Sequence, residues 1–160
     1  MSVNCKSTEE LTLSVCMIIK DEERVLGRCL SSAAKIADEL IVVDTGSNDR
    51  SVEIAKEYTE LVYFEPWQNS FARARNFAAS KASGDYVMWL DADDVIYPDE
   101  IKKILQIKEQ LARKDDTAPK WDVVFMTYRN YGFLSDLGVR AWRSIRPDSF
   151  HRPRRNTRRA

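Results

Sequence analysis

The sequence predicts an α/β fold in which a doubly wound, mostly parallel sheet carries helices on both faces. Three observations lead to this prediction. Short, continuously apolar runs recur along the chain, as expected for parallel strands that are buried on both faces. Segments with helical spacing of apolar residues separate these runs, and alternating strands and helices form parallel sheets through right-handed crossovers. Two of the runs end abruptly in aspartates, at Asp44 and at Asp91.

The overall composition is that of a globular protein. The 160 residues fit one domain, and 44% of them are hydrophobic and 31% charged. No run approaches the ~20 apolar residues of a membrane span, and the first residues do not have the pattern of a signal peptide. Cys5, Cys16 and Cys29 are an odd number of cysteines without metal-ligand spacing. We therefore expect buried free thiols and a cytoplasmic location.

The formal net charge of zero hides two oppositely charged regions. Positions 140–160 carry eight arginines and one acid, whereas positions 1–139 carry 17 basic and 24 acidic residues, a net charge of −7. We predict an N-terminal extension over 1–11, one α/β domain over 12–138 and a basic, disordered tail over 139–160. Clustered arginines can contact nucleic-acid phosphates, but the acidic body opposes that function. Peripheral contact of the tail with anionic lipid headgroups is the alternative.

The first half of the chain is predicted to form two strand-helix units and a third strand. Acidic residues after the first apolar run predict a helix start, because carboxylates are favoured at the positive end of a helix dipole. Small and capping residues after the second run predict a tight turn into the next helix. The predicted elements of this half are strands at 13–19, 40–43 and 61–64, a helix opened by the acids at 21–23, and a helix from Asn48 or Asp49 through Tyr58.

The second half adds two helices and two strands. Ser70 is the predicted cap of a helix on which Arg73 and Arg75 lie about 200° apart, so only one of the two can face a given ligand. Pro98, followed by two acids, predicts a second helix start. The predicted elements of this half are a helix from 70 to 83–84, a strand at 86–90, a helix from Pro98 and a fifth strand at 121–128.

The acidic strand ends are the candidate binding residues. The carboxyl edge of a parallel sheet is where ligands bind in open α/β folds, and Asp44 can accept hydrogen bonds from a ribose or a base there. Asp91 and Asp93, one residue apart, suit a hard divalent cation that shares oxygens with a substrate phosphate. The alternatives are an Asx turn at Asp44 and turn or helix-cap chemistry at Asp91 and Asp93.

Other chemistry is less specific. Arg75 and Asn76 can reach a phosphate, because a planar guanidinium makes bidentate contacts, but they can equally form a solvated helix face. The sequence contains neither a G-x-G-x-x-G motif nor a Walker lysine motif, which disfavours a dinucleotide fold and a P-loop. The single histidine, His151, lies among the arginines of the tail.

Four motifs occur in order within residues 12–130. They are Val-Cys-Met-Ile-Ile-Lys-Asp-Glu at 15–22, Ile-Val-Val-Asp-Thr-Gly-Ser-Asn-Asp at 41–49, Ala-Arg-Asn at 74–76 and Leu-Asp-Ala-Asp-Asp at 90–94. This combination resembles the family 2 glycosyltransferases of GT-A fold. In appearance it is most similar to bacterial lipopolysaccharide-core β-glucosyltransferase-like members and to their relatives that glycosylate peptides.

The resemblance implies a nucleotide-sugar donor, a UDP-sugar, together with Mg²⁺ or Mn²⁺. Residues 12–138 would then form the GT-A nucleotide-sugar-binding domain. Carried over position by position, the resemblance places the nucleotide beside six residues and the metal at the D-x-D motif. The residues implied at the nucleotide are Ile19, Asp21, Glu22, Asp44, Arg75 and Asp91, and those implied at the metal are Asp93 and Asp91.

The resemblance also implies an inverting transfer. An acceptor hydroxyl or thiol would attack the anomeric carbon while the diphosphate leaves, and a carboxylate base would take the acceptor's proton. The acceptor would be a saccharide, a lipid-linked sugar or a peptide.

The sequence departs from the family pattern after Gly138, where it shows no acidic pair, no His-Glu pair and no further strand-helix unit. Asp94, Asp136 and Asp148 are the available carboxylates, and none is assigned as the base. We therefore expect the chain to be the nucleotide-binding half of a glycosyltransferase, truncated at its carboxyl end. A non-catalytic nucleotide-sugar-binding module and a nucleotidyltransferase are the alternatives, although Lys20-Asp21-Glu22 is a poor substitute for a triphosphate-binding loop.

Overall fold

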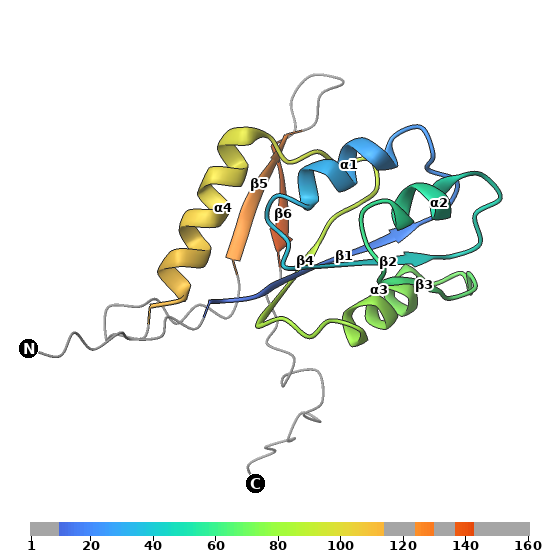
Figure 1. The fold of residues 1–160 in the computed structure, drawn as a ribbon, viewed down its shortest axis with the longest axis horizontal. Helices are drawn as coiled ribbons and strands as arrows, with labels where there is room; N and C mark the ends of the chain where they lie inside the picture. Colours follow the sequence, from blue (N-terminus) through green and yellow to red (C-terminus); the bar gives the residue numbers. More distant parts are fainter. Residues whose placement is uncertain (1–9, 114–123, 130–136, 143–160) are drawn as a thin grey trace, which may run out of the picture.

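The computed structural model describes residues 10–113, 124–129 and 137–142. Its centre is a four-stranded sheet of order β3-β2-β1-β4, in which all neighbouring strands are parallel (Figure 1). Four helices alternate with these strands, which confirms the predicted α/β class. The strands are β1 Leu13–Ile19, β2 Glu39–Asp44, β3 Val62–Phe64 and β4 Tyr86–Trp89, and the helices are α1 Leu26–Ala33, α2 Ser51–Lys56, α3 Phe71–Ser80 and α4 Pro98–Leu111.

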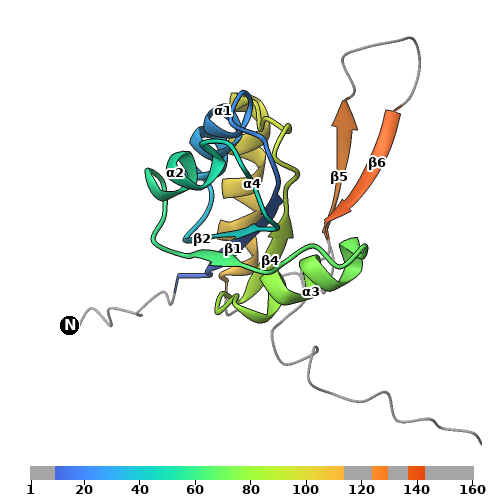
Figure 2. The same ribbon diagram turned by 90° about the vertical axis from the view of Figure 1, so that its right-hand side faces the viewer.

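Side chains alternate across the sheet and form two apolar layers, one on each face. In β1, Val15 and Met17 belong to the layer that contains buried residues of α1, α2 and α4. Cys16, between them, belongs to the layer that contains Ala78 of α3. Figure 2 shows α3 on the opposite side of the sheet from α1 and α2. The prediction of helices on both faces is confirmed.

Two helix starts follow the sequence closely. The Ser70 hydroxyl accepts a hydrogen bond from the Arg73 amide at 3.3 Å, as expected of an N-cap residue. Helix α4 begins at Pro98, and the Glu100 carboxylate accepts a hydrogen bond from the Tyr97 amide at 2.9 Å. Helix α3 ends at Ser80, earlier than predicted, and α2 is a short helix that begins at Ser51.

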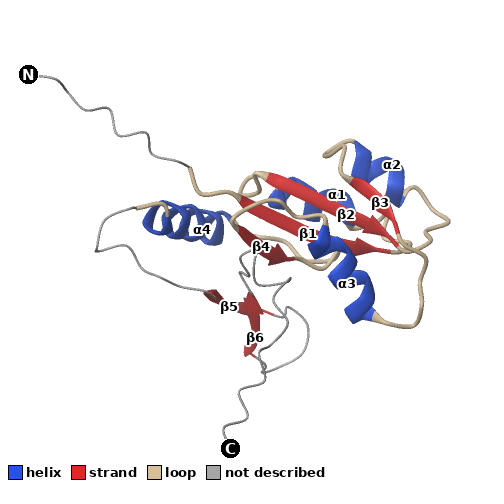
Figure 3. Cartoon of the chain, turned by 90° about the horizontal axis from the view of Figure 1, so that it is seen from below, coloured by secondary structure: helices blue, strands red, loops and turns tan. Residues whose placement is uncertain are grey.

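The fifth predicted strand has a different partner from the one expected. Residues 124–129 form β5, which pairs antiparallel with β6, Leu137–Trp142, in a separate two-stranded sheet (Figure 3). The expectation that this strand continues the β-α-β series was wrong, because its hydrogen bonds go to the next strand in sequence. Strand β6 also crosses the predicted boundary at 138/139. The rest of the predicted tail, 143–160, lies outside the described residues, as does most of the predicted N-terminal extension.

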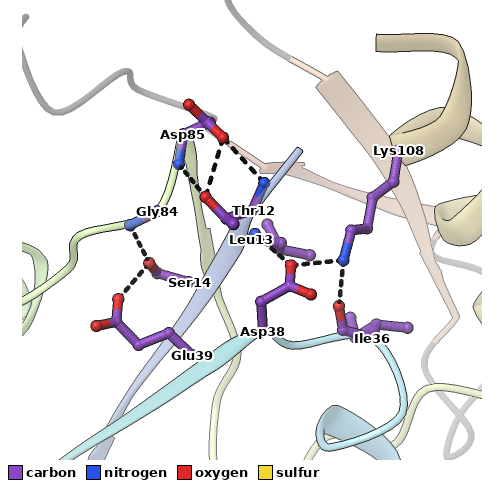
Figure 4. A network of polar contacts seen from close by, with 9 residues as sticks. All are labelled: Thr12, Leu13, Ser14, Ile36, Asp38, Glu39, Gly84, Asp85 and Lys108. Atoms are coloured by element: carbon purple, nitrogen blue, oxygen red, sulfur yellow. Dashed lines mark hydrogen bonds and ion pairs between the residues drawn. The ribbon is translucent and has the colours of Figure 1, made fainter. Parts of the chain in front are cut away.

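A polar network joins the amino ends of three strands (Figure 4). The Gly84 amide donates to the Ser14 hydroxyl at 2.9 Å, and that hydroxyl donates to Glu39 at 2.5 Å. The Asp85 carboxylate accepts from both the amide and the hydroxyl of Thr12 at 2.9 Å. These bonds hold β1, β2 and β4 in fixed register at one edge, and therefore also fix where the three strands end at the opposite edge.

Helix α4 is attached to the same edge. Lys108 Nζ lies 2.5 Å from the Asp38 carboxylate and 3.3 Å from the Ile36 carbonyl oxygen, and Asp38 also accepts from the Leu13 amide at 2.6 Å (Figure 4). The lysine stem and its charge thus join the helix to the turn before β2.

Candidate functional site

The carboxyl ends of β1, β2 and β4 lie side by side. Ile19 is paired with Asp44 in the register of β1 and β2, and the Thr45 amide donates to the Ile19 carbonyl at 3.0 Å. On the other side of β1, the Leu90 amide donates to the Cys16 carbonyl at 3.1 Å, just before Asp91. The two acidic strand ends are therefore at one edge of one sheet. The Ile19 side chain is 2% exposed and packs in the core, so only its backbone can border a ligand.

Asp44 forms the Asx turn that the sequence left as an alternative. Its carboxylate accepts hydrogen bonds from the Gly46 amide at 3.1 Å and the Ser47 amide at 3.0 Å, and the residue is 6% exposed. Gly46 has φ of 112°, which side-chain-bearing residues rarely adopt. A carboxylate has about four acceptor positions, so this turn leaves Asp44 capacity for a ligand hydroxyl.

The acids after β1 do not open a helix, and that prediction was wrong. Asp21 has φ of 55°, which no right-handed helix contains, and α1 begins only at Leu26. The Asp21 carboxylate instead accepts from the Asn48 amide at 2.7 Å, while its own amide donates to the Ser47 hydroxyl at 2.9 Å. The loops after β1 and β2 are thus joined to each other.

Further bonds complete this loop-to-loop contact. The Glu22 amide donates to the Ser51 hydroxyl at 2.7 Å, and the Glu23 amide donates to the Asp49 carboxylate at 3.0 Å. In return, Glu23 accepts from the Arg50 amide at 3.1 Å. Sequence reasoning missed this role of the serines and of Asp49, although the run of small polar residues at 47–51 was recognised as a turn. The pairing of two loops distant in sequence has no local signal.

Negative charge from three strand ends gathers around Glu22. Burial, and then the charges of Asp93, Asp49 and Asp21, raise the pKa of the Glu22 carboxyl above its usual value. The Glu22 and Asp93 side chains therefore lie near enough to repel one another electrostatically. A cation placed between them would relieve this repulsion.

The D-x-D motif combines turn chemistry with an accessible carboxylate. The Asp94 amide donates to the Asp91 carbonyl at 3.0 Å, and the Asp91 amide donates to the buried Asp94 carboxylate at 3.2 Å. Asp93 is exposed between them. The turn alternative therefore describes Asp91 and Asp94, while Asp93 faces solvent. Of the other carboxylates considered as bases, Asp136 and Asp148 lie outside the described residues.

Arg75 reaches the D-x-D motif, and Arg73 does not. Arg75 Nη2 lies 3.1 Å from Asp91 Oδ1, and its guanidinium carbon lies 6.0 Å from the centre of the Trp89 ring. Arg73 Nε lies 2.9 Å from Glu65 Oε1. The two arginines thus have different partners, as their spacing on the helix predicts. Asn76, the neighbour of Arg75, is exposed.

The carboxylates at this edge suit a divalent cation whose remaining coordination positions are filled by substrate oxygens and water. Across residues 10–113, 124–129 and 137–142, no group of three or more His, Cys, Asp or Glu side chains is placed to hold a metal ion. Asp91 and Asp93 offer carboxylates from one turn, and Mg²⁺ sites commonly use one or two carboxylates together with waters and phosphate oxygens. The residues present are thus compatible with Mg²⁺ or Mn²⁺ bound together with a diphosphate.

The expected buried thiols are present at two positions. Cys16 and Cys29 are free and buried, and burial raises the pKa of each thiol to about 12. Nearby carboxylates contribute in both cases, Glu39 for Cys16 and chiefly Asp94 for Cys29. The Cys29 Sγ donates to the Asp91 carbonyl at 3.3 Å, so this thiol supports the D-x-D turn from the core. Cys5 lies outside the described residues.

A depression of about 630 Å³ lies at the other edge of the sheet, around the amino ends of the strands. Its acids, Asp38 and Glu39, already bond to Lys108 and Ser14. Among the described helices, none has the length and apolar character needed to cross a bilayer.

The sequence and the fold match known proteins. A TPR repeat-containing protein of Synechococcus elongatus is 42% identical over 103 residues, which cover 62% of this chain and 26% of that protein. The lipopolysaccharide core biosynthesis glycosyltransferase LpsC of Rhizobium meliloti is 28% identical over 143 residues, which cover 86% of this chain and 50% of LpsC. The crystal structure of S. aureus TarS in complex with UDP-GlcNAc is similar with a TM-score of 0.50 and 25% identity, over 62% of this chain and 32% of the TarS chain.

The chain spans between about a quarter and a half of the length of these proteins. The family model of glycosyl transferase family 2 matches residues 14–158, which is most of the chain and includes all the acidic strand ends described above. Together with the parallel sheet and its carboxylates, this match shows that the chain belongs to glycosyl transferase family 2.

Proposed function

We propose that this chain binds the nucleotide part of a UDP-sugar and a divalent cation at the carboxyl edge of its sheet, as part of an inverting sugar transfer. The observation that carries the proposal is the meeting of Arg75 with Asp91 at 3.1 Å, beside the exposed Asp93. A guanidinium and two carboxylates at one point can hold a cation and an anionic diphosphate together.

Each residue has a role in this proposal. Asp44, at the end of β2, would accept a hydrogen bond from the ribose or the uracil. Asp21 and Glu22 border the nucleotide through the loop after β1, with Asp21 also fixing the neighbouring loop through the Asn48 amide. Arg75 would lie on the nucleotide side of the pocket, and Asp91 near the ribose. Asp93, the exposed carboxylate, would contact the metal.

The proposed transfer is a nucleophilic displacement at the anomeric carbon of the sugar. An acceptor oxygen forms a bond to the anomeric carbon as the bond from that carbon to the diphosphate oxygen breaks, and UDP leaves with the bonding electrons. A bound Mg²⁺ or Mn²⁺ would supply charge neutralisation of the diphosphate. The guanidinium of Arg75 adds a fixed positive charge to the same edge. The acceptor's proton goes to a carboxylate base that we do not assign to a residue.

The relatives support a UDP-sugar donor. TarS, at 25% identity and a TM-score of 0.50, was crystallised with UDP-GlcNAc, and LpsC is described as a glycosyltransferase of lipopolysaccharide core biosynthesis. By analogy we propose a saccharide, lipid-linked or peptide acceptor. We also propose a cytoplasmic location, in keeping with the free, buried thiols of Cys16 and Cys29.

Calorimetry with UDP tests the proposal. The parent should bind UDP when Mn²⁺ or Mg²⁺ is present and bind it much more weakly in a chelator. Asp93→Ala should weaken UDP binding at least about tenfold, which corresponds to about 1.4 kcal/mol. Asp99→Ala is the matched control, since Asp99 is an exposed acid in the first turn of α4 and pairs with Lys102. UDP binding that is unaffected by both chelator and Asp93→Ala would contradict the proposal.

A non-catalytic nucleotide-sugar-binding module is the second candidate. It is favoured by the position of Asp94, the one carboxylate considered as a base that lies within the described residues, because its carboxylate is buried and bonded to the Asp91 amide. This candidate predicts metal-dependent UDP binding without sugar transfer. Measuring UDP release from UDP-sugars with saccharide and peptide acceptors separates the two. Competition by nucleoside triphosphates that exceeds competition by UDP would instead favour a nucleotidyltransferase.

A further inference from the structure

Two aromatic side chains lie in contact at the start of α3, close to the carboxyl edge. The Trp67 and Phe71 ring centres are 4.8 Å apart, and the ring planes meet at 70°. Phe71 is 64% exposed although it is a large apolar residue. Trp67 is half-buried, and its indole N–H donates to the Asn69 side chain at 3.1 Å. The pair is thus held in one arrangement while presenting apolar ring surface to solvent.

Helix formation does not require this exposed pair. Ser70 already caps α3 with its side chain, and Phe71 is the first helical residue. A hydrophobic staple would join the residue before the cap to the fourth helical residue, which here would be Asn69 and Ala74. The Trp67–Phe71 contact does not have that spacing, and the core layer behind α3 is formed by other residues, such as Ala78.

Backbone and helix geometry place the pair between the two halves of the proposed nucleotide site. The Trp67 amide donates to the Thr45 carbonyl at 3.3 Å, so Trp67 is tied to the chain just past Asp44. Phe71 and Arg75 are four positions apart in α3 and lie on the same helix face. Arg75 in turn contacts Asp91. The pair is therefore attached to the chain just past Asp44 and shares a helix face with the arginine that contacts the D-x-D motif.

The loops that follow β1 and β2 offer no ring on which a base could stack. Residues 20–25 and 45–50, which follow β1 and β2, contain no aromatic residue. Trp89 is already positioned near the guanidinium of Arg75. Exposed aromatic rings beside a cationic side chain are a common way to hold a nucleobase, because every base has a π-face.

We infer that Trp67 and Phe71 form a stacking surface for the base of the bound nucleotide. This inference rests on the proposed function, since it requires that a nucleotide occupies the carboxyl edge. Stacking supplies affinity for the base without reading its identity, whereas Asp44 would provide the directional hydrogen bond. The pair thereby extends the nucleotide site beyond the residues that carry the family motifs.

The inference is tested by measuring how alanine variants of the aromatic pair bind two ligands, one with a base and one without. Calorimetry would compare UDP with ribose 5-diphosphate, which has the same diphosphate but no base. Trp67→Ala and Phe71→Ala should each weaken UDP binding roughly 5- to 150-fold, the range for loss of one base-stacking contact, and leave ribose 5-diphosphate binding unchanged. Trp67→Phe should retain most of the UDP affinity. Tyr58→Ala, at an exposed aromatic residue on the amino-edge depression, is the control.

The outcomes separate this inference from the proposed function. If the parent binds neither ligand with metal present, the proposed function fails and the stacking role fails with it. If the parent binds UDP and both alanine variants bind it equally well, the stacking role alone is wrong. Equal loss of both ligands would show that the pair only supports the fold of the loop, which would also overturn the inference. Selective loss of UDP affinity supports it.

Discussion

Arg75 on α3 and Asp91 after β4 are 16 positions apart in sequence and 3.1 Å apart in space. Helix α3 covers one face of the sheet, and the D-x-D turn lies at the carboxyl edge of the same sheet. The contact between Arg75 and Asp91 therefore joins the helix to that edge. The pair is partly exposed, so its contribution to stability is small. Its importance is in placing a planar cation beside the carboxylates.

Replacing Arg75 by lysine should therefore affect binding more than stability. Lysine keeps the charge but loses the planar fork that can contact a carboxylate and a phosphate together. We expect Arg75→Lys to weaken metal-dependent UDP binding by about tenfold, or about 1.4 kcal/mol, with little change in melting temperature. Arg73→Lys, on the other face of α3, should bind UDP within about twofold of the parent. Equal effects of the two substitutions would contradict the assignment of Arg75 to the site.

Gly84 should tolerate no side chain. A Cβ at this position would lie 2.6 Å from the Ser14 hydroxyl oxygen and 2.9 Å from the Ser14 amide nitrogen, where the strand backbone cannot move aside. We expect Gly84→Ala to lower the free energy of unfolding by about 1–3 kcal/mol, as overpacking does. Urea denaturation of the parent and the variant measures this difference in the free energy of unfolding.

Gly27→Ala is the matched control for that substitution. A Cβ there would meet its nearest neighbour, Ile54 Cγ2, at 3.8 Å, an ordinary contact distance. Because Gly27 lies within α1, alanine should raise the free energy of unfolding by up to about 1 kcal/mol. If Gly84→Ala proves as stable as Gly27→Ala, the close approach of β1 and β4 is not as described.

Glu22 should make stability depend on pH. Its raised pKa means that the folded state holds this proton more tightly than the unfolded state does. The resulting stabilisation is fully present below the ordinary pKa of 4.5 and is lost as the pH rises through the raised value. Glu22→Gln removes the charge, so it should raise the melting temperature near pH 7 and have little effect near pH 4. A larger gain at the lower pH would contradict the sign of the shift.

Asp21 should be replaceable by asparagine but not by alanine. Asparagine tolerates a positive φ and retains an oxygen that can accept from the Asn48 amide, whereas alanine does neither. We expect Asp21→Ala to cost about 1–2 kcal/mol in urea denaturation and Asp21→Asn clearly less. If the two variants are equally stable, the loop-to-loop contact contributes little.

Strand positions could be predicted from sequence because they depend on local pattern. The run at 13–19 is apolar except for Ser14, and it forms β1 with the predicted bounds. Pro98 and Ser70 likewise marked helix starts through chemistry within one turn. The two acidic strand ends could be placed at one edge because parallel strands all point the same way.

Features that depend on distant partners could not be predicted in this way. Nothing near Asp21 shows that its amide and carboxylate bond to Ser47 and Asn48, and without those bonds the acids suggest a helix start. The antiparallel partner of β5 was missed because residues 137–142 mix Gly and Arg with apolar residues. The Trp67–Phe71 contact could not be predicted from the spacing of apolar residues either, because it depends on the backbone turn at Asn69.

The order of the strands has a consequence for how the protein is made. β1 leaves the ribosome before β2 and β4, yet it is an inner strand whose second neighbour, β4, begins at Tyr86, and the Ser14–Gly84 bond spans 70 positions. Until β4 has been synthesised, the nascent chain exposes one side of an apolar strand with unpaired backbone groups, which is a template for aggregation. Protection of the growing chain by chaperones would matter most during that interval.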